Sequence, residues 1–154
     1  MNPEIETLYG HKVRVRVCGL CWKGDTLLMV NHQGLADGGF WAPPGGGLEF
    51  GETAEERLKT EFLEETGLHI SVGAFSFACE FIASSLHAIE LFFQVTIHEG
   101  TLKKGHDPEL NIIDDVRFMS LAELSAFPPH RIHGIFSQVK TIDDLKTLNG
   151  FFRI

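Results

Sequence analysis

Three glutamates fall within five consecutive positions of this chain, at Glu61, Glu64 and Glu65. In an α-helix of about 3.6 residues per turn, these positions share one face within a single turn. Neighbouring carboxylates repel one another, and the C-terminal end of a helix disfavours negative charge. Carboxylate oxygens on a rigid element suit a hard divalent cation. The spacing therefore indicates either a metal site or a solvated acidic helix face.

The segment before this cluster favours the metal site. Residues 41–52 read WAPPGGGLEFGE, and so many glycines and prolines rule out regular secondary structure there. A glycine-rich loop can expose backbone carbonyls and amides to a cation or a phosphate. Glu49 and Glu52 add two carboxylates at the end of the loop, next to the expected start of the helix.

Local signals place the glutamate cluster on a helix between Thr53 and Gly67. Thr53 is followed three residues later by Glu56, which fits a capping box, and Gly67 is a suitable C-terminal stop. Apolar residues at helical spacing mark the face expected to be buried. These are Ala54, Leu58, Phe62 and Leu63.

Strand patterns flank this helix in the sequence. Valines alternate with basic residues at the start of residues 12–22, a turn signal covers 23–26 and a second strand follows at 27–32, which predicts a hairpin. The remaining patterns predict a loop at 33–40, strands at 70–79 and 88–98 with a candidate strand between them, a polar loop at 99–111, a strand at 116–120, and helical segments at 121–126 and 132–148. Strands around a central helix predict an α/β fold that forms a single domain over residues 1–154.

The stretch from residue 46 to residue 68 resembles the Nudix box. That signature runs glycine, five residues, glutamate, seven residues, then Arg-Glu, an aliphatic residue, any residue, Glu-Glu, any residue, glycine and an aliphatic residue. Gly46, Glu52 and the segment EFLEETGL at 61–68 match at these intervals. Thr60 stands where the family has arginine, which typically pairs with the glutamate at the position of Glu52. Arg57, one helical turn earlier, is a hypothetical replacement.

The resemblance to the Nudix hydrolase superfamily (MutT-like and ADP-ribose pyrophosphatase-like proteins) implies an α/β/α sandwich with a mixed β-sheet. It also implies Mg²⁺ or Mn²⁺ dependence and cleavage of a phosphoric anhydride bond. The expected substrate is a nucleoside diphosphate linked to another moiety, such as a nucleotide sugar, an ADP-ribose-like compound or a dinucleotide. Two alternatives stay open: a nucleoside triphosphate pyrophosphohydrolase that releases a monophosphate and pyrophosphate, and a noncatalytic nucleotide-sensing module.

The same resemblance gives the acidic residues their expected roles. Glu61, Glu65 and the Gly46 carbonyl are the principal metal ligands, and Glu64 is a ligand or the general base. Glu52 either supports the ligands from outside or binds a second ion. Family members often use a glutamate from a loop beyond the sheet as the base, and Glu109 is the candidate for that role, with an exposed loop acid as the alternative.

Substrate contacts are less sharply indicated. Arg14 and Arg16 are candidates to face the phosphates from the first strand, although a solvated strand face is the competing interpretation. Trp41 either stacks on a base or packs beneath the loop. His130 and His133 are predicted to be surface residues, and the C-x-x-C formed by Cys18 and Cys21 is predicted to be buried and unreactive, because positions three apart on a strand face opposite ways.

Bulk properties limit the partners. The formal net charge of −8 argues against binding to nucleic acid polymers or anionic membranes, but it permits a small phosphorylated ligand bridged by a cation. Apolar runs are too short to cross a bilayer, and the N-terminal MNPEIETLYG lacks the features of a signal peptide, so we expect a cytoplasmic protein. The oligomeric state is open, with a homodimer as one option.

Overall fold

The computed structural model describes residues 3–106 and 112–154 as a mixed β-sheet with helices on both sides. The elements are α1 (Pro3–Tyr9), β1 (Lys12–Lys23), β2 (Thr26–His32), β3 (Phe40–Ala42), β4 (Gly45–Gly47), α2 (Ala54–Thr66), β5 (Leu68–Ala83), β6 (Leu86–Gly100), β7 (Ile113–Ser120), α3 (Leu121–Ser125), the 3-10 helices η1 (Pro129–Arg131) and η2 (Gly134–Gln138), α4 (Ile142–Thr147) and β8 (Gly150–Arg153). In the described part of the chain, no helix is long and apolar enough to span a membrane.

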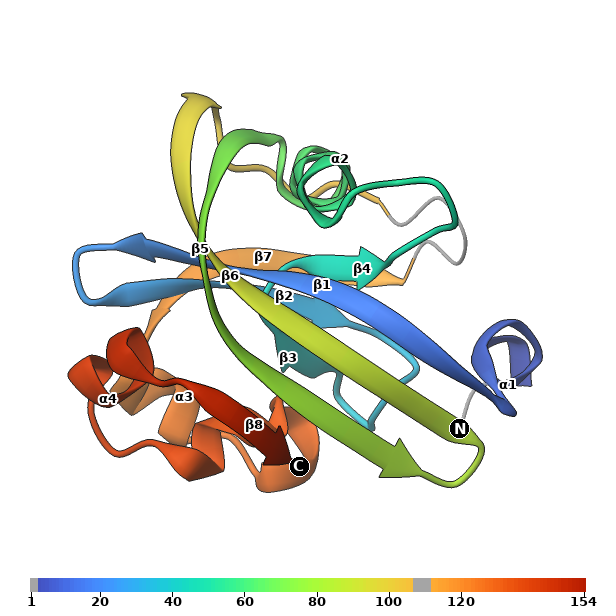
Figure 1. Cartoon of the computed structure of the whole chain (residues 1–154). Coiled ribbons are helices and arrows are strands. Elements are labelled where there is room, and N and C mark those ends of the chain that lie inside the picture. The colour runs from blue at the N-terminus through green and yellow to red at the C-terminus, as the bar shows by residue number, and fades with distance from the viewer. Residues whose placement is uncertain (1–2, 107–111) are drawn as a thin grey trace.

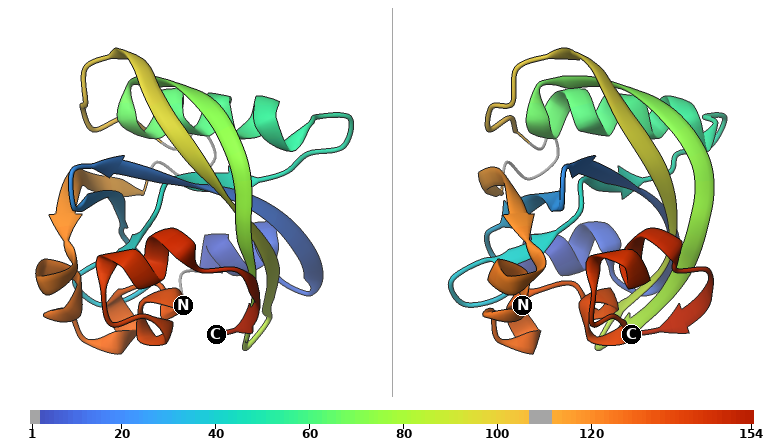
Figure 2. Two further views of the ribbon diagram at one scale, coloured as in Figure 1. Left: turned by 60° about the vertical axis from the view of Figure 1, so that its left-hand side comes forward. Right: turned by 90° about the vertical axis from the view of Figure 1, so that its left-hand side faces the viewer.

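The strands form one connected sheet with the order β3-β2-β1-β6-β5-β8, while β4 pairs with β1 and β7 pairs with β2. The β1–β6 and β5–β8 pairs are parallel and the other strand pairs are antiparallel. Figure 1 shows α2 on one side of the strands and α3 and α4 on the other, and both views in Figure 2 show the same layering. The expected α/β/α sandwich with a mixed sheet is confirmed.

Two apolar clusters fill the space on the two sides of β1. Cys18 belongs to the cluster that includes Phe77 and Phe92, whereas Cys21 belongs to the cluster around Leu58 and Phe62 of α2. Both cysteines are buried and unpaired, as the sequence predicts. The sheet and α2 are therefore packed together through an apolar contact, which sets the position of α2 relative to β1.

The segment at 41–47 differs from the irregular loop that its composition predicts. It contains two short strands, and β4 pairs with β1 through Arg16↔Gly47, Val17↔Gly46 and Cys18↔Gly45. A Cβ on Gly45 would lie 2.2 Å from the Val17 carbonyl oxygen, so only glycine allows this approach. Glycine usually interrupts a strand, but Gly45–Gly47 form a strand that has no side chains.

Other boundaries also differ from expectation. The region between the two predicted strands holds no third strand, because β5 and β6 extend through it to their connecting turn. The predicted last helix at 132–148 is divided into η2 and α4. Leu63 is 45% exposed although its spacing predicts burial. The hairpin, α2, the cores of β5 and β6, β7 and α3 agree with the sequence patterns, while α1 and β8 were not predicted.

Candidate active site

Helix α2 is fixed at both ends by the signals that the sequence carries. The Thr53 hydroxyl accepts from the Glu56 N–H at 3.1 Å, and the Glu56 carboxylate accepts from the Thr53 N–H at 2.9 Å. Gly67 ends the helix with a φ of 74°, in the left-handed region that favours glycine. The carboxylates near the C-terminal end of α2 therefore project from a rigid support.

Glu65 is buried at the contact between α2, β4 and β2, with only 3% of the residue exposed. One carboxylate oxygen accepts from the Gly45 N–H at 2.8 Å, and the other lies 3.4 Å from Nε2 of His32. His32 Nδ1 is buried without a hydrogen-bond partner among the described residues. His32 is thus a polar member of this site that the sequence pattern did not single out.

Glu61 lies against the bare backbone of β4. A Cβ on Gly46 would fall 2.3 Å from the Glu61 carboxyl, so glycine is what brings this backbone next to the carboxylate. Burial and the negative charges of Glu65 and Glu64 raise the pKa of Glu61 to about 8, against the opposing effect of Arg57. A carboxyl held this way is poised to gain a cation in place of its proton.

Arg57 binds the carboxylate that the family arginine normally binds. Its guanidinium donates to the two oxygens of Glu52 at 2.8 and 2.9 Å, and to Glu61 at 3.0 Å. Thr60, at the family position, instead donates its hydroxyl to the Glu56 carbonyl at 3.1 Å on the exposed side of α2. Arg57 thus makes the contact that the compensation hypothesis requires, and its hydrogen bond lowers the pKa of Glu52.

The oxygen atoms at this site are of the kind that bind a hard divalent ion, although the side chains do not converge on one point. Among the described residues, no three His, Cys, Asp or Glu side chains converge in metal-binding geometry. One Glu61 oxygen accepts from Arg57, and one Glu65 oxygen accepts from the Gly45 N–H. Carboxylates beside the Gly46 backbone supply oxygen donors, which Mg²⁺ and Mn²⁺ prefer. Glu64 is half-buried on the same helix.

The chain returns to the carboxylate end of α2 after β6. The N–H groups of Lys103, Gly105 and His106 donate to the carbonyl oxygens of Thr66, Glu65 and Glu64 at 3.0, 3.0 and 3.1 Å. These bonds satisfy carbonyls that the helix leaves unpaired at its end. They also bring residues 103–106 against the acidic cluster. Glu109, the candidate base, lies outside the described residues and stays a prediction.

Arg16 and His133 do not occupy solvated surfaces. Arg16 Nη1 lies 2.5 Å from Glu90 Oε2, and His133 Nε2 lies 2.7 Å from Glu90 Oε1. The Glu90 and His133 side chains are each 5% exposed, so the surface position expected for His133 is wrong, while His130 is exposed as predicted. Burial alone would raise the pKa of Glu90, but His133 and Arg16 lower it to about 2, and the carboxylate is charged.

The burial of β1 differs from what its alternation suggests at residues 13–16, whereas Val17 is fully buried and Lys12 is exposed. Val13 and Val15 are 60% and 39% exposed, whereas Arg14 and Arg16 are half-buried. The Arg14 guanidinium lies 3.8 Å from the centroid of the Tyr9 ring, and a Cβ on Gly47 would fall 2.7 Å from Arg14 Nη2. Arg14 and Arg16 are therefore only partly exposed, which differs from a fully solvated strand face.

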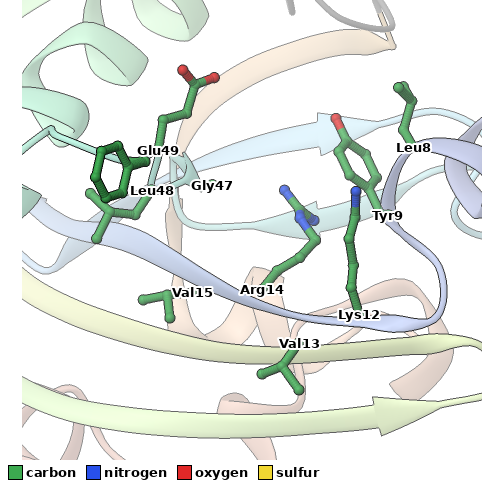
Figure 3. Close-up of a pocket in the computed structure, with 10 residues that line it drawn as sticks. Leu8, Tyr9, Lys12, Val13, Arg14, Val15, Gly47, Leu48 and Glu49 are labelled. Atoms are coloured by element: carbon green, nitrogen blue, oxygen red, sulfur yellow. The ribbon is translucent and has the colours of Figure 1, made fainter.

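Arg14 also forms part of a pocket of about 610 Å³ between α1, β1 and the loop after β4. Figure 3 shows Lys12 and Arg14 extending from β1 on the side of Tyr9, while Val13 points the other way. Gly47 and Glu49, from the strand and loop that precede α2, line the same space. The pocket thus begins one residue beyond Gly46.

Trp41 is placed in the core. Only 3% of the residue is exposed, its ring centroid lies 5.9 Å from that of Phe127, and the Arg117 guanidinium lies 4.9 Å from its centroid. Of the two interpretations of this residue, the structure favours packing beneath the loop over stacking on a substrate.

A comparison with protein families identifies the family of the chain. The model of the NUDIX domain matches residues 10–138, which includes β1, the glycine strand and the whole of α2. The chain belongs to the Nudix family.

Individual relatives agree with this assignment. An ADP-ribose pyrophosphatase of Methanocaldococcus jannaschii is 35% identical over 104 residues, which make up 65% of this Nudix chain and 60% of that protein. The match therefore spans less than two thirds of the relative. A Nudix hydrolase structure from Nitrosomonas europaea aligns with a TM-score of 0.74 at 18% identity and covers 90% of this chain and 93% of the other. A UDP-X diphosphatase structure aligns with a TM-score of 0.70 at 20% identity, with coverage of 92% and 67%. At such identities the two structures show a shared fold.

Within this Nudix site, three residues were missed by sequence patterns. His32 reaches Glu65 from β2, and Glu90 and His133 hold Arg16 from β6 and the C-terminal segment. Glu90 carried one available signal, since it is an acid inside an otherwise apolar strand pattern. The two histidines carried no comparable signal, because their partners lie on other elements.

Proposed function

We propose that this Nudix protein, acting as one domain over residues 1–154, is a metal-dependent pyrophosphohydrolase for a nucleoside diphosphate linked to a second moiety. An ADP-ribose-like compound is the preferred substrate class, with nucleotide sugars and dinucleotides as further members. The observation that carries the proposal is the packing of the buried Glu65 and the half-buried Glu61 against the side-chain-free backbone of Gly45 and Gly46. The similarity to an ADP-ribose pyrophosphatase supports the substrate class.

Mg²⁺ or Mn²⁺ is the proposed cofactor. Glu61, Glu65, Glu64 and the Gly46 carbonyl would hold the ion, which would neutralise phosphate charge and acidify a bound water. Glu52 has both carboxylate oxygens engaged by Arg57, so we assign it the supporting role rather than that of a ligand to a second ion. Glu64 and Glu109 remain the two candidates for the general base.

Arg14 and Arg16 are the proposed phosphate contacts. They occupy alternate positions of β1, so both point to the same face of the sheet. A Cβ on Gly47 would point at Arg14, and one on Gly46 would point at Glu61. A strand without side chains therefore separates the arginines from the carboxylates. A diphosphate lying across it would meet the cation on one side and guanidinium groups on the other. The rest of the substrate would occupy the pocket beside Tyr9.

A substrate panel tests the proposal. The purified protein is incubated with ADP-ribose, nucleotide sugars, dinucleotides and nucleoside triphosphates in Mg²⁺ or Mn²⁺, and the products are separated by chromatography. We expect a nucleoside monophosphate and a phosphorylated second product from the diphosphate compounds. Pyrophosphate release from triphosphates alone would favour the alternative hydrolase. Tight binding of panel members without turnover would favour the sensing module. A homodimer and a cytoplasmic location stay predictions.

A further inference from the structure

Arg16, Glu90 and His133 form a buried series of polar contacts, of which the proposed function uses only Arg16. They come from β1, from β6 and from the residue before η2, and their links measure 2.5 and 2.7 Å. Arg16 and Glu90 are paired in register on neighbouring parallel strands. The contacts therefore join the C-terminal segment to the strand next to the glycine strand.

The tautomer of His133 follows from its second contact. The backbone N–H of Ile135 donates to His133 Nδ1 at 3.2 Å, so this nitrogen carries a lone pair. Nε2 then carries the proton and donates it to Glu90 Oε1. With Oε1 bound to His133 and Oε2 bound to Arg16, both oxygens of Glu90 are engaged, and the carboxylate has a fixed orientation.

Stability alone does not explain these buried polar contacts. A buried ion pair contributes little net stability, because desolvation offsets most of the attraction. Arg16, however, keeps an opening to solvent, since 23% of its side chain is exposed against 5% for Glu90. In the described part of the chain, Glu90 is the one hydrogen-bonded partner of the Arg16 side chain. Other N–H groups of the guanidinium are therefore available.

The available edge of Arg16 lies close to the proposed metal ligands. Arg16 pairs with Gly47 on the side of β1 opposite to β6, one position from the Val17↔Gly46 pair. The charges of Glu65 and Glu61 act on the Arg16 guanidinium, which places it within electrostatic range of both. A phosphate held by a cation at Gly46 would have this guanidinium as its neighbour.

We propose that Glu90 and His133 position Arg16 so that its remaining N–H groups bind a phosphate oxygen of the substrate that the cation leaves uncovered. This inference rests on the proposed function. Glu90 and His133 are positioning residues that act through Arg16, and Arg16 is the group that touches the ligand. The ligand class is a nucleoside diphosphate, recognised through charge-assisted hydrogen bonds to its phosphates.

A double-mutant cycle on ligand affinity tests this chain of action. ADP in the presence of Mg²⁺ is titrated into the full-length protein by calorimetry, and thermal midpoints are recorded for each variant. Arg16→Met is expected to weaken ADP binding about 10-fold to 100-fold, as for loss of a charged hydrogen bond. His133→Leu is expected to weaken it about 10-fold, whereas His133→Gln, which keeps a donor for Glu90, stays close to wild type. Lys140→Met is the control for loss of one positive charge at an exposed site.

The decisive result is the double variant. If His133 acts through Arg16, His133→Leu has no further effect on ADP affinity in the Arg16→Met background. An equal effect in both backgrounds, or wild-type binding by Arg16→Met, overturns the inference. Arg16→Met leaves the buried Glu90 without its cationic partner, so Arg16→Met/Glu90→Gln, which removes both charges, replaces it as the background if Arg16→Met unfolds. Failure of the proposed function gives a different result: no panel member is hydrolysed by the wild-type protein.

Discussion

Arg57 and Glu52 are joined by two hydrogen bonds of 2.8 and 2.9 Å across the start of α2. Paired guanidinium and carboxylate groups of this kind are both strong and geometrically specific. The family arginine would stand at Thr60, so the cation has moved by three residues, which is close to one helical turn. Arg57 binds Glu52 from the first half of α2, so the loop keeps its attachment to the helix although Thr60 does not contact Glu52.

Removal of Arg57 should therefore impair the site without unfolding the protein. We expect Arg57→Met to lower metal affinity or kcat about 10-fold to 100-fold, because groups that orient metal ligands have effects of that size. Thr60→Arg alone should change little, since Glu52 already has a partner. The double variant Arg57→Thr/Thr60→Arg should recover part of the loss. Mn²⁺ titrations and steady-state kinetics on the three variants measure these effects. Wild-type kinetics in Arg57→Met would contradict the supporting role of Arg57.

The use of Arg57 in place of an arginine at position 60 shows which features can be predicted from the sequence. Helix α2 was predictable because its cap, its apolar stripe and its stop lie within one short segment. The function of Arg57 was only a hypothesis, because the partner of a long side chain depends on how the preceding loop returns. Alternation in β1 gave the two faces correctly but could not say which face is buried. Glu90 and His133 meet through tertiary contacts 43 residues apart in the sequence, which no local pattern encodes.

Glu65→Gln tests the central role of the acidic cluster. Glutamine keeps an oxygen for the Gly45 N–H but loses the charge that a cation needs, so the fold should survive. We expect kcat to fall by about 100-fold or more, because the ion contributes several kcal/mol of stabilisation to the transition state. Glu55→Gln is the matched control on the same helix, since Glu55 is exposed and forms a surface ion pair of 2.8 Å with Lys59. Equal activity of the two variants would contradict the assignment of Glu65.

The raised pKa of Glu61 predicts how the protein responds to pH without metal. Its pKa rises from 4.5 to about 8 through burial and the charges of Glu65 and Glu64. An acid with a raised pKa in the folded state favours folding below its unfolded value, and this contribution is lost as the pH rises through about 8. The metal-free protein should therefore lose thermal stability over this interval, and Glu61→Gln should lose less.

Cation binding should reverse the same effect. An ion at Glu61 displaces the proton, so the affinity for Mn²⁺ should increase with pH up to about 8 and then level off. Calorimetry at pH 7 in two buffers with different heats of ionisation measures the proton released on binding. Glu61→Gln should release fewer protons. A proton count that is the same in both proteins would show that Glu61 is already ionised before the cation arrives.

Gly46 and Gly47 separate the two halves of the site, and alanine at each should have a different consequence. A Cβ at Gly46 would lie 2.3 Å from the Glu61 carboxyl, whereas a Cβ at Gly47 would lie 2.7 Å from Arg14 Nη2. In both cases the nearest group is the end of a side chain that can move, so stability should change little. Gly46→Ala should then weaken Mn²⁺ binding and lower kcat, because it displaces a proposed ligand. Gly47→Ala should raise KM with little effect on Mn²⁺ binding, because it displaces a proposed phosphate contact. Parallel measurements of metal affinity, KM and kcat distinguish the two, and the same defect in both variants would show that the carboxylates and the arginines do not act on opposite sides of β4.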